Sequence, residues 1–248
     1  MIVAVASGKG GTGKTTVAVS LALSAPGKVR LLDCDVEELD CYLFLRCGYV
    51  TSSSVGLPVP VVDAAACTAC GVCGELYLSE TRVGPMVHAC LEPGGESSGK
   101  LVSLVRQEAR RIAAERGEDL ILVDGPAGIG CPVIASLAGA TTMLAVAEPT
   151  VSGAHDLARL LELAAHFRVP AAVCVNKWDL SPALTGKVED VARDSGTPVL
   201  GRIPYDLSVT AAQVAGRTAV EQEGVTADRI VALWERLQRV GGNGATRN

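Results

Sequence analysis

The sequence predicts an α/β fold with a doubly wound, mostly parallel sheet. Short apolar runs alternate with stretches of helical periodicity over most of the 248 residues, as in strands joined by crossover helices. The apolar runs are rich in Ala, Val and Leu, and the aromatic residues are only two Trp, four Tyr and two Phe. Such aliphatic strands are expected where helices cover both faces of a sheet. A sheet of this kind binds ligands at the carboxyl ends of its strands.

Six apolar runs of strand length follow one another along the chain. The expected strands are 2–6, 29–32, 120–123, 143–147, 171–175 and 198–200. The expected helices are 14–24, 100–116, 132–139, 153–166 and 184–195. Residues 226–240 carry apolar side chains at helical spacing, and the polar face between them has both charge signs. This stripe predicts a final helix that packs on its own domain and not on a membrane surface.

Residues 47–96 break this alternation, because they are rich in Gly, Pro and Cys and contain a Thr-Ser-Ser-Ser run. A loop of this length without its own organisation is unusual inside a compact domain. We therefore expect a small cysteine-containing insert at 47–96, held together by its cysteines. The main domain is expected to consist of residues 1–46 and 97–248.

Charge and cysteine content restrict the partners and the compartment. The formal net charge of −5 argues against broad nucleic-acid binding, which needs a basic face. No segment approaches the ~18 apolar residues of a membrane span, so neither nucleic acid nor membrane is an expected partner. Nine cysteines without a secretory signal favour a reducing compartment, and the chain is expected to be cytoplasmic.

A glycine-rich loop follows the first predicted strand and leads into the first predicted helix. Residues 8–15 fit the phosphate-loop pattern G-x-x-x-x-G-K-[ST] in full. Backbone N–H groups of such a loop turn toward phosphate oxygens at a helix N-terminus. Lys14 is expected to reach the β- and γ-phosphates, and the Thr15 hydroxyl is expected to bind Mg²⁺. The nucleotide-binding residues predicted here are Gly8, Gly10, Gly11, Thr12, Gly13, Lys14, Thr15 and Thr16.

A second lysine, Lys9, stands early in this loop. With it, residues 9–16 read K-G-G-T-G-K-T-T, which resembles the deviant Walker A motif of the MinD/ParA-type P-loop ATPases, relatives of the nitrogenase iron protein. The resemblance implies a P-loop NTPase fold, ATP as ligand, and ATP-dependent dimerisation in which Lys9 touches the partner's nucleotide. The partner is then an identical chain or a related ATPase. A solvated loop charge is the alternative for Lys9.

Two carboxylates continue the resemblance. Asp35 closes the second predicted strand, and the family's aspartate at this place lies next to the attacking water and the metal. Residues 120–128 look like a Walker B strand running into switch II, which makes Asp124 an expected Mg²⁺ ligand. The predicted catalytic residues are therefore Lys9, Lys14, Asp35 and Asp124, and the predicted Mg²⁺ ligands are Thr15, Asp35 and Asp124.

The segment 175–179, Val-Asn-Lys-Trp-Asp, follows another predicted strand. The family uses the asparagine at this place to contact the adenine edge, so Asn176 is the expected base-reading residue. Sequences of the form N-K-x-D also occur in GTPases, which leaves GTP as an alternative. The segment 203–206 resembles the family's lining for the other side of the base, and it adds Pro204 to the predicted site.

Cys67, Cys70 and Cys73 form a C-x2-C-x2-C run, with which bacterial [4Fe–4S] ferredoxin motifs begin. Tyr77 stands where the two-cluster ferredoxins have their next cysteine, so one cluster is expected, with Cys90 as its fourth ligand. A subset of MinD/ParA-like ATPases carries a ferredoxin-like insert, and the chain resembles a shortened version, related to Mrp-type iron–sulfur carriers. A structural zinc site with four thiolates and an empty site are the alternatives.

The other cysteines have separate interpretations. Cys41 and Cys47 are alternatives for the fourth cluster ligand. Cys34 and Cys174 lie within apolar strands and are expected in the core. Cys131 follows the switch II segment at a place similar to a cluster ligand of the nitrogenase iron protein, and packing at a helix start is its alternative.

These motifs predict a Mg-ATP-dependent dimerising ATPase coupled to an iron–sulfur cluster. It would act in electron transfer or in iron–sulfur and metallocofactor assembly, with a protein client that receives electrons or the cofactor. The alternatives are a MinD/ParA-like positioning or partition ATPase and a zinc-stabilised ATPase switch. A positioning role needs a membrane-binding tail or a basic DNA-binding surface, and neither is evident in the sequence.

Overall fold

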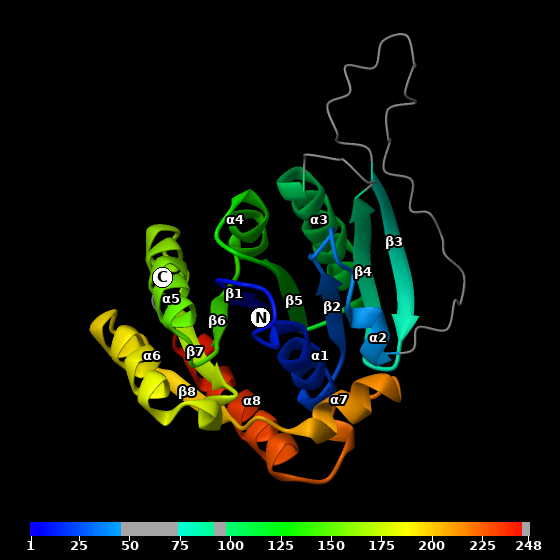
Figure 1. The fold of residues 1–248 in the computed structure, drawn as a ribbon. Helices are drawn as coiled ribbons and strands as arrows, with labels where there is room; N and C mark the ends of the chain where they lie inside the picture. The colour runs from blue at the N-terminus through cyan, green and yellow to red at the C-terminus, as the bar shows by residue number, and fades with distance from the viewer. Residues whose placement is uncertain (46–73, 92–97, 245–248) are drawn as a thin grey trace.

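The computed structural model describes residues 1–45, 74–91 and 98–244, which form one sheet with helices on both faces (Figure 1). The strand order is β3-β4-β2-β5-β1-β6-β7-β8, and all neighbours are parallel except β3 and β4. The strands are β1 (Ile2–Ser7), β2 (Val29–Asp33), β3 (Gly74–Thr81), β4 (Gly84–Leu91), β5 (Leu120–Ala127), β6 (Thr142–Ala147), β7 (Ala171–Asn176) and β8 (Val199–Ile203). The predicted α/β fold with a mostly parallel sheet is confirmed.

Each face of the sheet has its own layer of helices. One layer consists of α1 (Lys14–Ser24), α2 (Cys41–Leu45), α7 (Leu207–Val214) and α8 (Val225–Gly244). The other consists of α3 (Ser98–Arg116), α4 (Cys131–Leu137), α5 (Val151–His166) and α6 (Pro182–Asp194). Two short 3₁₀ helices, η1 (Trp178–Leu180) and η2 (Ala219–Glu221), lie in the connections. The short helices α2 and α7 are not among the predicted elements.

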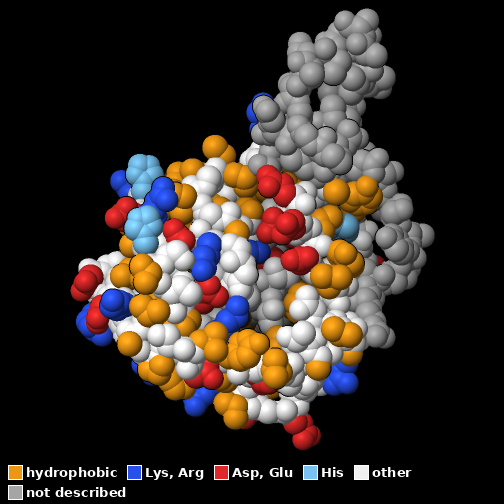
Figure 2. Space-filling view, viewed as in Figure 1, with side chains coloured by type: hydrophobic (Ala, Val, Ile, Leu, Met, Phe, Trp, Pro, Cys, Tyr) orange, Lys and Arg blue, Asp and Glu red, His pale blue; other side chains and the backbone are white. Residues whose placement is uncertain are grey.

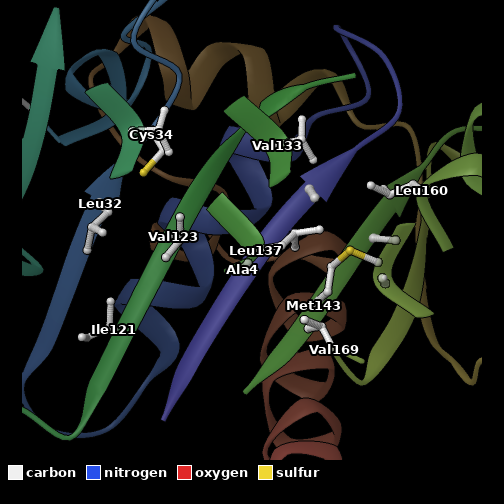
Figure 3. Close-up of a cluster of buried hydrophobic side chains, with 14 of the residues drawn as sticks. Ala4, Leu32, Cys34, Ile121, Val123, Val133, Leu137, Met143, Leu160 and Val169 are labelled. Atoms are coloured by element: carbon white, nitrogen blue, oxygen red, sulfur yellow. The ribbon is translucent and has the colours of Figure 1, made fainter. Parts of the chain in front are cut away.

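Aliphatic side chains fill the space between the sheet and each helical layer. Because successive strand residues point to opposite faces, one strand supplies both layers. On the face covered by α3 to α6, Ala4, Leu32 and Val123 of three neighbouring strands pack in one cluster with Val133 and Leu137 of α4 (Figure 3). The core therefore needs few aromatic residues.

The last helix and two cysteines have the positions that the sequence predicts. In α8, the apolar stripe faces the sheet, and Ile230, Leu233 and Trp234 are buried. Cys34 and Cys174 are fully buried in the core. Of the helices in the described ranges, none combines the length and apolar character needed to cross a membrane.

The hairpin of β3 and β4 differs from the sequence prediction. The sequence pattern predicts it as part of the insert 47–96, whereas β4 pairs with β2 and extends the main sheet. Met86 and Val87 of β4 are buried, one in each layer. Gly84 and Pro85 at the start of β4 are typical of a turn, so they conceal a strand whose pairing partner lies about fifty residues earlier in the chain. The remainder of the insert lies outside the described residues.

A buried ion pair joins the start of β2 to the loop before β5. Arg30 donates from Nε and Nη2 to the two carboxylate oxygens of Glu118, each at 2.8 Å. The side chains are 0% and 3% exposed. This pair lies at the end of the sheet remote from the glycine-rich loop.

We expect Glu118→Ala to lower the free energy of unfolding by about 3–5 kcal/mol, because it leaves the Arg30 charge buried without a partner. Urea unfolding followed by circular dichroism measures this change. The double variant Arg30→Met with Glu118→Leu removes both charges and should recover most of the lost stability. Equal midpoints for Glu118→Ala and the wild type would contradict the expectation.

Candidate nucleotide site

The glycine-rich loop connects β1 to α1, which begins at Lys14. Gly13 has a left-handed backbone (φ +86°), and a Cβ added to it would collide with the amide nitrogen of Asn176. A Cβ at Gly8 would collide with Asp156 of α5. Glycine is therefore required at both positions, and the loop keeps its backbone N–H groups at the start of α1, where an anion is favoured.

Lys14 lies at the centre of a buried polar cluster. Its Nζ is 3.0 Å from Asp124 Oδ1 within β5, 3.7 Å from Asp35 Oδ2 after β2, and 3.3 Å from Thr15 Oγ1. The Lys14 side chain is 7% exposed and that of Asp124 is 1% exposed. The structure thus brings together four of the predicted site residues, because β2 and β5 are neighbours and β5 is next to β1.

Burial and charge act in opposite directions on this cluster. Burial alone would lower the pKa of Lys14, but the nearby carboxylates of Asp124 and Asp35 raise it above its ordinary value. Burial raises the pKa of Asp35 to about 6, and the positive charge of Lys14 limits that rise. Lys14 therefore stays charged and neutralises part of the carboxylate charge.

The donors fit a magnesium ion. The Thr15 hydroxyl and the carboxylates of Asp124 and Asp35 are hard oxygen ligands, which Mg²⁺ prefers together with water and phosphate oxygens. All three surround the same Lys14 ammonium group. An Mg²⁺ ion held by these donors would neutralise part of the charge of bound phosphates.

Two residues of this site are absent from the predicted set. Asp33 accepts hydrogen bonds from the backbone N–H of Asp35 (3.2 Å) and from that of Cys41, the first residue of α2 (3.1 Å). The Cys41 thiol lies 3.6 Å from Asp124 Oδ2. Burial, with the nearby charge of Asp124, raises the pKa of Asp33 to about 7. Asp33 therefore fixes the backbone of Asp35, and Cys41 is part of the nucleotide site.

A sequence signal for Asp33 exists, since it directly follows the predicted strand 29–32 just as Asp124 follows the predicted strand 120–123. In the structure the two aspartates pair in register. Paired residues of neighbouring parallel strands point to the same face. For Cys41 we find no such signal, because its place depends on how α2 packs.

Lys9 lies outside the buried cluster, at a more exposed rim. Its Nζ forms an ion pair with Glu148 at 2.5 Å, and it donates to Thr150 Oγ1 at 3.2 Å and to Ser152 Oγ at 3.3 Å. Glu148 also contacts Lys177 Nζ at 3.3 Å. Burial alone would raise the pKa of Glu148, but Lys9 and Lys177 lower it below its ordinary value. Glu148 is thus a shared partner of both lysines. It is not among the site residues predicted from the sequence.

A pocket of about 240 Å³ lies beside the glycine-rich loop. Asn176 and Pro204, the two residues predicted to contact the base, both line it, together with Tyr205. Asn176 donates from Nδ2 to the Thr12 carbonyl at 2.7 Å and accepts from the Lys177 backbone N–H at 3.0 Å. The pocket is next to the phosphate loop, where a base attached to bound phosphates would lie.

The predicted cluster ligands Cys67, Cys70 and Cys73 lie outside the described residues. Cys90 is exposed near the end of β4, and Cys131 is exposed at the first residue of α4. The [4Fe–4S] cluster and its zinc alternative therefore stay predictions of the sequence.

Charged groups gather on the face that Figure 2 shows, with acidic side chains near its centre and basic ones beside them. The carboxylates of Glu38 and Asp40 act together with burial to raise the pKa of Asp35. Figure 1, drawn from the same side, shows β2 and α1 near the centre of the view. A nucleotide with its metal ion would meet opposite charges at close range here.

Comparison with known proteins places these features in a family context. Residues 3–219 match the family model described as the CobQ/CobB/MinD/ParA nucleotide binding domain. The antiactivator FleN of Pseudomonas aeruginosa is 31% identical over 248 residues, covering 89% of this chain and 79% of FleN.

Two solved structures have a similar fold, each with a TM-score of 0.70 and 23% identity. One is the septum site-determining protein MinD of Pyrococcus horikoshii, complexed with Mg-ADP, with 99% of this chain and 98% of that chain covered. The other is the MinC:MinD cell division protein complex of Aquifex aeolicus, with 96% and 95% covered.

Proposed function

Because this chain belongs to the family of CobQ/CobB/MinD/ParA nucleotide binding domains, we propose that it is an ATP-driven dimer switch that positions or regulates a protein partner. The chain is an ATPase of the MinD/ParA type. The finer proposal is that ATP with Mg²⁺ joins two copies, that the dimer binds its partner, and that hydrolysis separates the copies again.

The observation that carries this proposal is the separation of the two loop lysines. Lys14 is buried against Asp124 and Asp35, so one chain supplies the phosphate-binding lysine and both carboxylates of the site. Lys9 is not part of that cluster, and its side chain is 30% exposed at the rim. A cation at the rim of a phosphate site is well placed to stabilise charge on a nucleotide held by a second chain.

The site residues then have distinct tasks. The loop N–H groups and Lys14 would hold the phosphates, and Thr15, Asp35 and Asp124 would hold Mg²⁺. Asp35, whose backbone is fixed by Asp33, orients the attacking water. Mg²⁺ supplies neutralisation of the phosphate charge when it is bound.

The positioning or partition role is better supported than a role coupled to an iron–sulfur cluster. Solved relatives of similar fold include a septum site-determining protein and a complex with MinC. The relatives named above give no support for an iron–sulfur cluster, and three of its predicted ligands lie outside the described residues. A protein partner is therefore proposed as the target of the switch, in place of an electron or cofactor acceptor.

Wild-type protein is expected to be monomeric with ADP and dimeric with ATP, with Mg²⁺ present in both samples. Multi-angle light scattering after size exclusion measures the mass directly. An Asp35→Asn variant, which should bind ATP without hydrolysing it rapidly, is expected to accumulate as the dimer. A monomer under all of these conditions would reject the switch.

Glu148→Gln is expected to shift ATP-dependent dimerisation to about two- to fivefold lower protein concentration. The Glu148 carboxylate holds Lys9 within its own chain, and a partly exposed ion pair of this kind contributes little more than about 1 kcal/mol. Removing its charge makes Lys9 easier to release. Sedimentation at several protein concentrations measures the shift.

Glu162→Gln, an exposed position on the same side of the sheet in α5, is the matched control with the same change of charge. If both variants shift the dimerisation equally, net charge and not the Lys9 contact is responsible.

A further inference from the structure

A groove of about 630 Å³ lies along the outer edge of the sheet at β8. It is flanked by α6 on one side and α8 on the other, and both helices pack against β8 (Figure 1). Its charged side chains come from α6, β8 and α8, and they are Glu189, Arg193, Arg202, Arg229 and Arg236. The groove is separate from the pocket beside the glycine-rich loop, since the two share no lining residue.

The groove is strongly basic, although the protein carries a net charge of −5. Its lining has four arginines and a single carboxylate. Arg202 donates to both oxygens of that carboxylate, Glu189, at 2.6 and 2.8 Å, and its guanidinium lies 5.4 Å from the Trp178 ring centre. This pair neutralises itself. Of the other three arginines, Arg193 is paired with Asp190 at the surface, so Arg229 and Arg236 supply the excess positive charge.

These three arginines are available to a ligand to different degrees. Arg193 has only a surface ion pair with Asp190, and its side chain is 71% exposed. Arg229 is exposed, and among the described residues no ion pair to it is found. Arg236 donates to the Leu200 carbonyl at 2.6 Å, so the edge of β8 faces into the groove. Guanidinium groups from two helices that line one groove suit several carboxylates of one extended segment.

We propose that the groove binds an acidic, extended segment of a partner protein. The basic lining of the groove is complementary to an acidic ligand. A short acidic segment can place its carboxylates against this lining without reaching the surface around the groove. A long polyanion such as DNA would continue onto the surrounding surface of an acidic protein and be repelled there. This proposal rests on the proposed switch for the role of the partner. Its test needs no ATP, so the groove proposal and the switch proposal can each fail without the other.

The test compares two double variants that change the net charge equally on the same two helices. Arg193→Glu with Arg229→Glu reverses two groove charges. Lys187→Glu with Arg239→Glu reverses two exposed charges on α6 and α8 that do not line the groove. None of these four residues belongs to the nucleotide site, so ATP hydrolysis should be unchanged in both variants and serves as the check of folding.

The probes are a fluorescein-labelled dodecamer of glutamate with serine spacers, the same peptide with glutamine for glutamate, a DNA duplex, and phosphatidylglycerol vesicles. Fluorescence anisotropy and vesicle sedimentation at low salt give the affinities. We expect wild-type protein to bind the glutamate peptide and not the glutamine peptide. The groove variant should lose about tenfold in affinity, and the control variant less than twofold.

Three results would overturn the proposal. Equal weakening in both variants would show that only long-range charge matters. Binding to the DNA or to the vesicles without binding to the glutamate peptide would assign the groove to another polyanion. No binding of wild-type protein to the glutamate peptide up to 1 mM would mean that the arginines only protect the sheet edge from pairing with other chains.

Discussion

Replacing Lys14 by methionine is expected to lower the rate of ATP hydrolysis at least about a hundredfold. Methionine keeps the unbranched shape that packs in this 7% exposed position but removes the charge that meets the phosphates. It also leaves Asp124 and Asp35 without their nearest cation, so the like-charged carboxylates repel a nucleotide. Steady-state phosphate release and the binding of a fluorescent ATP analogue measure the two losses separately.

Lys28→Met is the matched control, because Lys28 is exposed and lies in the loop before β2, at the other end of that strand from Asp35. The control should hydrolyse ATP at the wild-type rate. A Lys14→Met variant that is folded and hydrolyses ATP normally would refute the assignment of this site as the ATPase centre. Folding is checked by the urea midpoint, since removing a buried charge partner also changes stability.

Lys9→Ala is expected to lower hydrolysis by about 10³-fold and to abolish the ATP-dependent dimer. The estimate follows the effect of cationic residues that a second protein supplies to a phosphoryl-transfer site. Binding of ATP to the monomer should change little, because Lys9 contacts Glu148, Thr150 and Ser152 and not the buried cluster. Phosphate release and light scattering give the two results.

A mixing experiment separates action in the partner's site from action in the lysine's own site. A Lys9→Ala chain has an intact Asp35, and an Asp35→Asn chain has an intact Lys9. Each is expected to be nearly inactive alone, and their mixture should regain hydrolysis, because one composite site then has both residues. If the mixture stays inactive, Lys9 acts within its own chain.

The part of the site that follows from strand order could be predicted from the sequence. Lys14, Asp35 and Asp124 all stand where predicted parallel strands end or the first helix begins, so one edge of the sheet brings them together. Asn176 and Pro204 line the same pocket for the same reason. The pattern of the loop and the order of the strands carry this information without knowledge of packing.

The remainder depends on contacts between distant segments. Glu148 meets Lys9 139 positions earlier only because β6 lies beside β1. Cys41 enters the site through the packing of a five-residue helix, for which periodicity gives no signal. The β4 strand was concealed by its turn residues, and its burial becomes evident only beside β2.

The hydrogen bonds from β7 to the phosphate loop have a further consequence. Asn176 and Lys177 hold the carbonyls of Thr12 and Gly11, both at 2.7 Å, through bonds made within the chain itself. The loop is therefore preorganised, and the entropy of ordering it is lost during folding and not during binding. For the proposed switch we therefore expect hydrolysis and the lifetime of the dimer, and not a rearrangement of this loop, to set the period of the cycle.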